Sequence, residues 1–194
     1  MAWPRGYSAG KRIYLVRHAS AAPPGVLAGR ADYALSAEGR GEAEELRLRL
    51  AGVSFGLAFS SPLKRALQTA AVLLGGPPAG FVLTLPELAE ISLGRWEGRS
   101  KAWIREHYPV QWAARGRDLL NYPPPGGESL AELAARVLPV FDRIRLAAAA
   151  APGQTLVVAH QAVNRVILAR LGGTALEKSP DIPQPPCALT VIET

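Results

Sequence analysis

Two histidines, two arginines and one glutamate stand out in this sequence, because each follows or closely follows an apolar, strand-like run. Arg17 and His18 end the run IYLV, and His160 ends the run TLVVA. Arg65 lies one helical turn beyond the stretch SSP, and Glu90 lies in the loop-like segment ELAEISLGRWEG. If the strands lie side by side, these five side chains meet in one pocket.

Together these residue types can bind and transfer a phosphoryl group. Guanidinium groups match the planar oxygens of a phosphoryl dianion, and the N-termini of helices that follow the histidines add backbone N–H donors. A neutral imidazole can attack phosphorus to form a phosphohistidine, and a second, protonated imidazole can stabilise charge on the equatorial oxygens. A carboxylic acid can protonate the leaving alkoxide and later activate water.

Each residue taken alone also has an ordinary structural interpretation. The Arg-His pair can end a strand in solvent, and His160 can be a hydrogen-bonded histidine at a strand end. Glu90 alone is typical of a surface carboxylate, and Arg65 is typical of a solvated helix position. His107 has no partner in this set, and we interpret it as structural.

The elements that must position these residues alternate between strands and helices. Apolar runs predict strands over 13–16, 57–61, 81–85, 155–160 and 187–193, and helical periodicity predicts helices over 35–50, 61–74, 126–151 and 161–172. This order predicts a three-layer α/β sandwich with a mostly parallel central sheet flanked by helices. In such sheets the ligand site lies beyond the carboxyl ends of the strands, where Arg17-His18, Ser60-Ser61 and His160 fall.

Local signals mark the ends of the predicted helices. Ser36 is a candidate N-cap, and Ser61 is expected to cap a helix whose first position is Pro62. Ser129 and Glu132 have the spacing of a capping box, and Pro139 predicts a bend in the long helix that follows.

Length and composition predict a single domain over residues 1–194, with residues 1–12 as a flexible N-terminal extension. The lone Cys187 and only three histidines predict neither a disulfide framework nor a metal site. No apolar run approaches the ~20 residues that span a bilayer, and the start lacks a signal-peptide core, so we expect a cytoplasmic protein without membrane contact.

The charge balance favours an anionic partner. The net charge is +6 and the isoelectric point is about 9.9. The 22 basic residues form no run and are not interleaved with aromatic residues, so we expect a small phosphorylated substrate and no nucleic acid. The oligomeric state is not predicted.

Six motifs in order resemble those of the histidine phosphatase superfamily, which has the phosphoglycerate-mutase-like fold. They are LVRHAS, GRADYALSAEG, SSPLKRALQTA, LAEISLGRWEG, PGGES and VVAHQAVNR, and the similarity runs from about Ile13 to Ile192. The resemblance implies that His18 is the nucleophile, that Glu90 is the proton donor and that His160 is the second catalytic histidine. It also implies substrate or phosphate contacts from Arg17, Arg65, His160, Arg30 and Gln161. No metal or organic cofactor is implied.

The chain departs from the family pattern around both histidines. Ala19 replaces the usual glycine after the first, and Gln161-Ala162 replaces the usual Gly-Gly after the second. The added Cβ atoms would crowd backbone N–H groups against phosphate if these positions need positive φ. The family's asparagine shortly after the nucleophile is also absent. A non-catalytic phosphoryl-binding relative is therefore a second hypothesis.

The short segment between Glu90 and PGGES favours hydrolysis over a mutase reaction, because mutases of this family have extra segments that close over the site. Among short phosphatases, GRADYAL and WEG…YPPPGGES are most similar to the α-ribazole phosphatase group of cobalamin synthesis. We therefore expect a phosphomonoesterase, with α-ribazole 5′-phosphate as a candidate substrate and a phosphoglycerate mutase-type phosphotransferase as the alternative.

Overall fold

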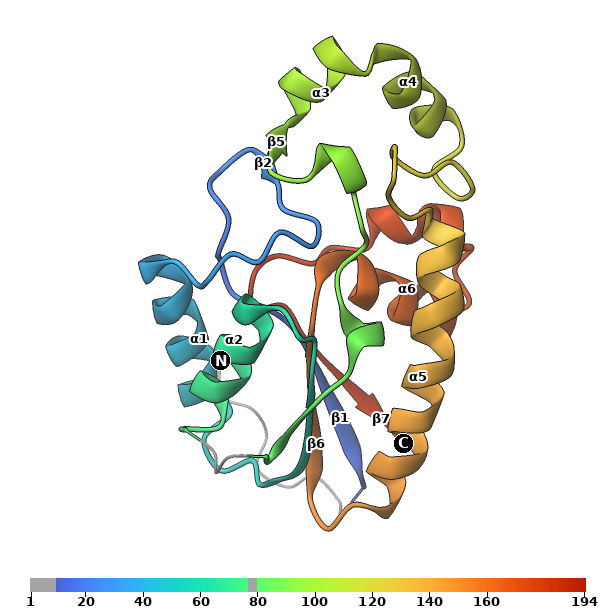
Figure 1. Ribbon diagram of the computed structural model, residues 1–194. Coiled ribbons are helices and arrows are strands. Elements are labelled where there is room, and N and C mark those ends of the chain that lie inside the picture. The colour runs from blue at the N-terminus through green and yellow to red at the C-terminus, as the bar shows by residue number, and fades with distance from the viewer. Residues whose placement is uncertain (1–9, 77–79) are drawn as a thin grey trace.

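A five-stranded sheet forms the centre of the protein in the computed structural model, which describes residues 10–76 and 80–194 (Figure 1). The strand order is β4-β3-β6-β1-β7. The strands are β1 (Arg12–Arg17), β3 (Phe55–Ser60), β4 (Val82–Thr84), β6 (Gln154–Ala159) and β7 (Leu189–Glu193). Within the described part of this five-stranded sheet, only the pairing of β7 with β1 is antiparallel. The predicted mostly parallel sheet is thus confirmed.

Helices cover both faces of this sheet, as expected for a three-layer α/β sandwich (Figure 1). α1 (Ala37–Arg49) and α2 (Lys64–Leu73) pack on one face, and α5 (Leu130–Ala150) and α6 (Gln161–Leu171) pack on the other. Successive side chains of a strand point to opposite faces. Accordingly, Val157 packs among the residues of α5 and α6, whereas Leu156 and Val158 pack with those of α1 and α2.

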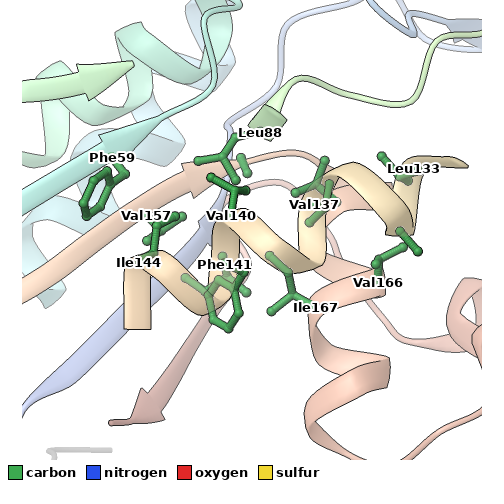
Figure 2. Packing of buried hydrophobic residues seen from close by; sticks show 14 of the residues in the cluster. Phe59, Leu88, Leu133, Val137, Val140, Phe141, Ile144, Val157, Val166 and Ile167 are labelled. Carbon is green, nitrogen blue, oxygen red and sulfur yellow. The ribbon is translucent and has the colours of Figure 1, made fainter. Parts of the chain in front are cut away.

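The larger core cluster lies between α5, α6 and the sheet. Figure 2 shows Val140, Phe141 and Ile144 of α5 packed near Val157 of the sheet and Ile167 of α6. This packing fixes β6 and the start of α6, and with them the position of His160 between the two elements. Within the described residues, no helix combines the length and apolarity that crossing a membrane requires.

Beyond the carboxyl ends of the parallel strands lies a smaller region that the sequence did not predict. It contains a two-stranded sheet of β2 (Val26–Leu27) and β5 (Arg99–Ser100), followed by α3 (Lys101–His107) and α4 (Pro109–Arg117) (Figure 1). Short 3-10 helices, η1 (Pro86–Leu88), η2 (Gly94–Trp96) and η3 (Leu176–Asp181), complete the connections.

Two of the three predicted helix starts are confirmed and one is wrong. Ser36 caps α1, and the capping box at the start of α5 is present, with Pro139 inside the helix. α2 instead begins at Lys64 after Leu63, with no side-chain cap, so Ser61 and Pro62 lie before it. The Ser61 hydroxyl is instead hydrogen-bonded to His160 Nε2, at 2.7 Å, at the edge of the sheet.

Lys11 and Arg12, the last two residues of the expected flexible extension, are held by hydrogen bonds to the rest of the protein. Arg12 is the first residue of β1, and its backbone N–H donates to Gln154 Oε1 at 2.8 Å. Lys11 Nζ donates to the carbonyl of Ala151. Residues 1–9 of the predicted extension lie outside the described residues.

The loop that follows His18 rests on the first turn of α1. Ser20 O accepts hydrogen bonds from the backbone N–H of Ser36 at 3.0 Å and from its hydroxyl at 3.2 Å. Gly39 lies so close to this loop that an added Cβ would come within 2.0 Å of Ser20 O. Only a residue without a Cβ allows this approach, which holds the chain directly after His18.

We predict opposite effects on stability for two glycines of α1. Gly39→Ala should lower the free energy of unfolding by about 1–3 kcal/mol, because the backbone at Ser20 has to move. Gly41→Ala is the matched control, since a Cβ there meets nothing within 4 Å, and it should raise the free energy by about 0.5–1 kcal/mol. Urea denaturation measures both changes. Equal effects of the two substitutions would contradict the close approach at Ser20.

Candidate active site

The register of the sheet brings the two predicted histidines together. Arg17 of β1 pairs with Ala159 of β6, and Ser60 of β3 pairs with Val158. The next residue of each strand therefore lies at the same edge, and the His18 N–H donates to Ala159 O at 3.0 Å. The rings of His18 and His160 have centroids 4.9 Å apart.

His18 is neutral, and its hydrogen bonds define which ring nitrogen carries the proton. Nδ1 lies 2.6 Å from Ala19 O, which can only accept, so Nδ1 bears the hydrogen. Nε2 accepts from Arg65 Nε at 3.2 Å and therefore carries the lone pair. Burial lowers the pKa of His18 to about 3, and the positive charges of Arg65 and Arg17 contribute to this decrease.

Arg65 is almost completely buried and is held by the loop after β2. Its Nη1 donates to Ala31 O and its Nη2 donates to Gly29 O, each at 2.7 Å. Desolvation lowers its pKa from the ordinary value, although the guanidinium remains charged. Each of the three guanidinium nitrogens of Arg65 thus donates a hydrogen bond, and the one that donates to His18 Nε2 is Nε.

Arg17 supplies a second cation to the same region. Its Nη1 donates to Gln184 O, and its Nε is buried without a hydrogen-bond partner among the described residues. An unpaired buried donor is costly, and a phosphoryl oxygen is an acceptor that would satisfy it.

His160 is fully buried at the N-cap position of α6. Its Nε2 is bonded to Ser61 Oγ at 2.7 Å, and its Nδ1 has no partner within the part of the chain that is described. Burial is the main cause that lowers the pKa of His160 well below the ordinary value, and the positive charge of Arg65 adds to it. The lowered pKa favours the neutral ring, whereas the chemistry considered from the sequence uses a protonated second imidazole beside the dianion.

Glu90 faces the histidines from the segment after η1. Its Oε1 accepts from the Ile91 N–H at 2.9 Å, and its Oε2 lies 3.5 Å from the Ala162 N–H in the first turn of α6. Desolvation raises its pKa, and this effect outweighs the two hydrogen bonds and the nearby Arg65 and Arg17 charges. A raised pKa keeps the carboxyl protonated to higher pH, which suits a proton donor.

A charged network that the sequence did not predict holds the backbone of Glu90. Arg136 Nη2 and Arg30 Nε each donate to Glu90 O at 3.0 Å. Both guanidinium groups also bind the Glu128 carboxylate, Arg136 at 2.6 Å and Arg30 at 3.2 Å. The only sequence signal for Glu128 was its place in PGGES, and Arg136 had the appearance of a solvated helix residue.

A cavity of about 360 Å³ opens between these residues. Five of the predicted site residues line it: Arg17, His18, Arg65, Glu90 and Gln161. His160 and Arg30 are not among the lining residues, and Arg30 instead donates a hydrogen bond to the backbone of Glu90. Within the described residues, no group of three or more His, Cys, Asp or Glu side chains is placed to hold a metal ion.

The residues that replace the family's glycines fit without backbone strain. Among the described non-glycine residues, Cys187 alone has a positive φ, of 54°. Ala19, Gln161 and Ala162 therefore adopt conformations open to any residue. The Ala19 N–H is bonded to Thr69 Oγ1 at 3.1 Å, and Gln161 Nε2 donates to Gln184 O at 3.3 Å. The crowding that positive φ would have caused does not arise.

Comparison with known proteins identifies the family and supports the fold. Residues 13–194 match the model of the histidine phosphatase superfamily (branch 1). The chain is 33% identical over 168 residues to adenosylcobalamin/alpha-ribazole phosphatase of Escherichia coli K12, covering 86% of this chain and 81% of that protein. The crystal structure of alpha-ribazole phosphatase from Shigella flexneri superposes with a TM-score of 0.85 at 28% identity, covering 93% of this chain and 89% of that one.

A bifunctional enzyme is also similar. The rat 6-phosphofructo-2-kinase/fructose-2,6-bisphosphatase 1 is 35% identical over 187 residues, which is 94% of this chain. This chain spans only 36% of the length of the rat protein. The match to the family model over nearly the whole sequence, together with these relatives, shows that the chain belongs to the histidine phosphatase superfamily.

Proposed function

We propose that this protein is a phosphomonoesterase that hydrolyses a small phosphorylated metabolite through a phosphohistidine on His18. The observation that carries the proposal is the state of His18: a neutral ring whose Nε2 lone pair lies beside Arg65 at the cavity. A neutral imidazole with a fixed tautomer is the form that attacks phosphorus.

In the first step, the hydrogen bond of the Arg65 Nε–H passes from His18 Nε2 to a phosphoryl oxygen, the freed Nε2 lone pair attacks phosphorus, and the bond from phosphorus to the ester oxygen breaks. The Glu90 carboxyl gives its proton to the departing oxygen, which leaves as an alcohol. The imidazole becomes positively charged as the N–P bond forms, and the Nδ1–H bond to Ala19 O stabilises that charge. Arg65, Arg17 and the N–H groups at the start of α6 are placed to bind the phosphoryl oxygens.

In the second step, the Glu90 carboxylate removes a proton from water and the resulting oxygen attacks phosphorus. The N–P bond breaks, inorganic phosphate forms, and His18 returns to its neutral state. The short connection between Glu90 and PGGES supports hydrolysis over the alternative mutase reaction, because mutases of this family have extra segments that close over the site.

The substrate that we propose is α-ribazole 5′-phosphate. The names of the Escherichia coli and Shigella flexneri relatives support this choice, as does the similarity of the GRADYAL and PGGES segments to that group. Turnover of a panel that includes α-ribazole 5′-phosphate and the phosphoglycerates tests it. A clear preference for phosphoglycerate interconversion over phosphate release would instead support the mutase.

The covalent intermediate gives the most direct test of the mechanism. Rapid acid-free quenching with a ³²P-labelled substrate should trap label on the wild-type protein that is stable to base and lost in acid, as for a phosphoramidate. His18→Ala should carry no label, because the attacking nitrogen is gone. Equal labelling of the two proteins would remove His18 from the nucleophilic role.

The role of Glu90 depends on the leaving group. General acid catalysis contributes about 10²–10⁴ in rate when the departing alkoxide is strongly basic. Glu90→Gln should therefore lose about 10²–10⁴ in the phosphorylation step on glycerol 3-phosphate, and much less on p-nitrophenyl phosphate, measured by burst kinetics.

Glu87→Gln is the matched control for this experiment. Glu87 lies three residues earlier, and its carboxylate forms a partly exposed ion pair with Arg143 at 3.6 Å. This variant should behave like the wild type on both substrates. If Glu87→Gln lost the alkyl phosphate reaction and Glu90→Gln retained it, the proton donor would have been assigned to the wrong carboxylate.

The protonation of His18 can be measured directly. Its ring should remain neutral with the hydrogen on Nδ1 from about pH 8 to pH 5, because burial and two arginines oppose a second proton. Protonation should begin only as the pH approaches about 3. ¹⁵N NMR of the imidazole nitrogens reports both tautomer and charge, and the His18→Ala spectrum provides the assignment. A doubly protonated ring at pH 6 would contradict this prediction.

A further inference from the structure

A second cavity, of about 300 Å³, adjoins the proposed phosphoryl site and lies under α4. Leu27 and Leu93 line both cavities, so the two meet at these side chains. The remaining lining residues come from η2, α4 and the chain that follows: Trp96, Trp112, Arg115, Gly116 and Leu119. The lining is thus mostly apolar and aromatic, in contrast to the cationic site beside it.

The two tryptophans define the shape of this cavity. The rings of Trp96 and Trp112 have centroids 5.6 Å apart with an angle of 43° between their planes. The guanidinium of Arg105 lies over the Trp112 ring, 5.2 Å from its centroid, and so restrains it. Rigid aromatic side chains of this kind favour planar apolar ligands.

Trp96 is enclosed by the fold. Its side chain is only 1% exposed, so its ring is held in a fixed position at the wall of the cavity.

We infer that this cavity, defined by Leu27, Leu93, Trp96 and Trp112, binds the organic part of the substrate. The inference rests on the proposed phosphatase function, because it places the leaving alcohol next to the phosphoryl group. The favoured substrates are phosphomonoesters whose alcohol carries a planar aromatic group. Small polyol phosphates leave this cavity unused, so they gain nothing from it.

The chain provides a way to fill the cavity without disturbing the fold. Gly116 lines the cavity from α4, its φ is not positive, and a Cβ at this position meets nothing within 4 Å. Gly116→Leu should therefore fold, since glycine inside a helix is itself unfavourable. Gly41→Leu in α1 is the matched control, because a Cβ there also meets nothing within 4 Å and the residue is remote from both cavities.

The test compares quinolin-6-ylmethyl phosphate with glycerol 3-phosphate, two alkyl phosphates that require the same chemistry at phosphorus. The wild type should prefer the quinolinyl substrate in kcat/KM. Gly116→Leu and Trp112→Ala should each lower kcat/KM for it by about tenfold or more. The same variants should leave glycerol 3-phosphate unchanged within about twofold, as should Gly41→Leu for both substrates.

Binding without turnover separates this inference from the proposed function. In the His18→Ala background, calorimetry should show tighter binding of quinolin-6-ylmethyl phosphate than of glycerol 3-phosphate, and Gly116→Leu should remove the difference. If Gly116→Leu removes that difference while the wild-type protein, with His18 present, hydrolyses neither ester, the cavity would be supported and the phosphatase refuted. Hydrolysis through His18 with no effect of Gly116→Leu or Trp112→Ala on the quinolinyl substrate would refute the cavity alone.

Discussion

Buried positive charge is the constraint on which the rest of this site depends. Arg17 and Arg65 lie in a largely desolvated region, and burial is the main reason that the pKa of each is lowered. Within the described residues, neither forms an ion pair with a carboxylate at 4 Å or less. The carbonyls of Gly29, Ala31 and Gln184 offset part of the cost by accepting their N–H groups. A phosphoryl dianion would supply the missing countercharge, so the fold stabilises a site that favours this ligand.

The same desolvated, positive environment sets three protonation states at once. It lowers the pKa of His18 and of His160, because burial disfavours a charged imidazole and the positive charge of the arginines adds to that effect. It also raises the pKa of Glu90, since burial disfavours the carboxylate more strongly than the arginines favour it. A neutral imidazole at the proposed nucleophile and a raised pKa at the proposed proton donor thus arise from one physical cause, without separate tuning of each group. The binding of a dianion would oppose the effect on His160 and favour its protonation.

The sequence predicted the sheet edge well, and the reason is geometric. In a parallel sheet the carboxyl ends of the strands meet, so apolar runs that end in Arg17-His18 and His160 indicate one site. The role of Ser61 was missed, because its position before Pro62 resembles a helix cap and nothing local shows that it binds His160. Glu128 and Arg136 were missed for a related reason: charged residues near a helix start are usually solvated, and only the fold shows that they hold Glu90.

The region of α3 and α4 escaped prediction because it buries very little. Ile104 is the only buried residue of α3, and α4 contains none, so neither helix has a clear apolar face. Helices that cover a cavity rather than a core lack the periodicity that predicts helices facing a core. Their arrangement depends on contacts made elsewhere, chiefly through the segment that contains Trp96.

That segment, residues 90–97, connects the two ends of the proposed site. Its backbone is joined to the PGGES segment by Arg95 N–H to Pro125 O at 3.0 Å and by Glu128 N–H to Ser92 O at 2.8 Å. Gly94, with φ of 53°, makes this approach possible, because a Cβ would come within 2.3 Å of Pro125 O. Glu90 begins the segment, and Trp96 lies next to its last residue. An aromatic group bound beside Trp96, as we infer, would be linked to the proposed proton donor by seven residues of hydrogen-bonded chain. In this way, the energy of binding the organic group can be used to align the ester oxygen with Glu90.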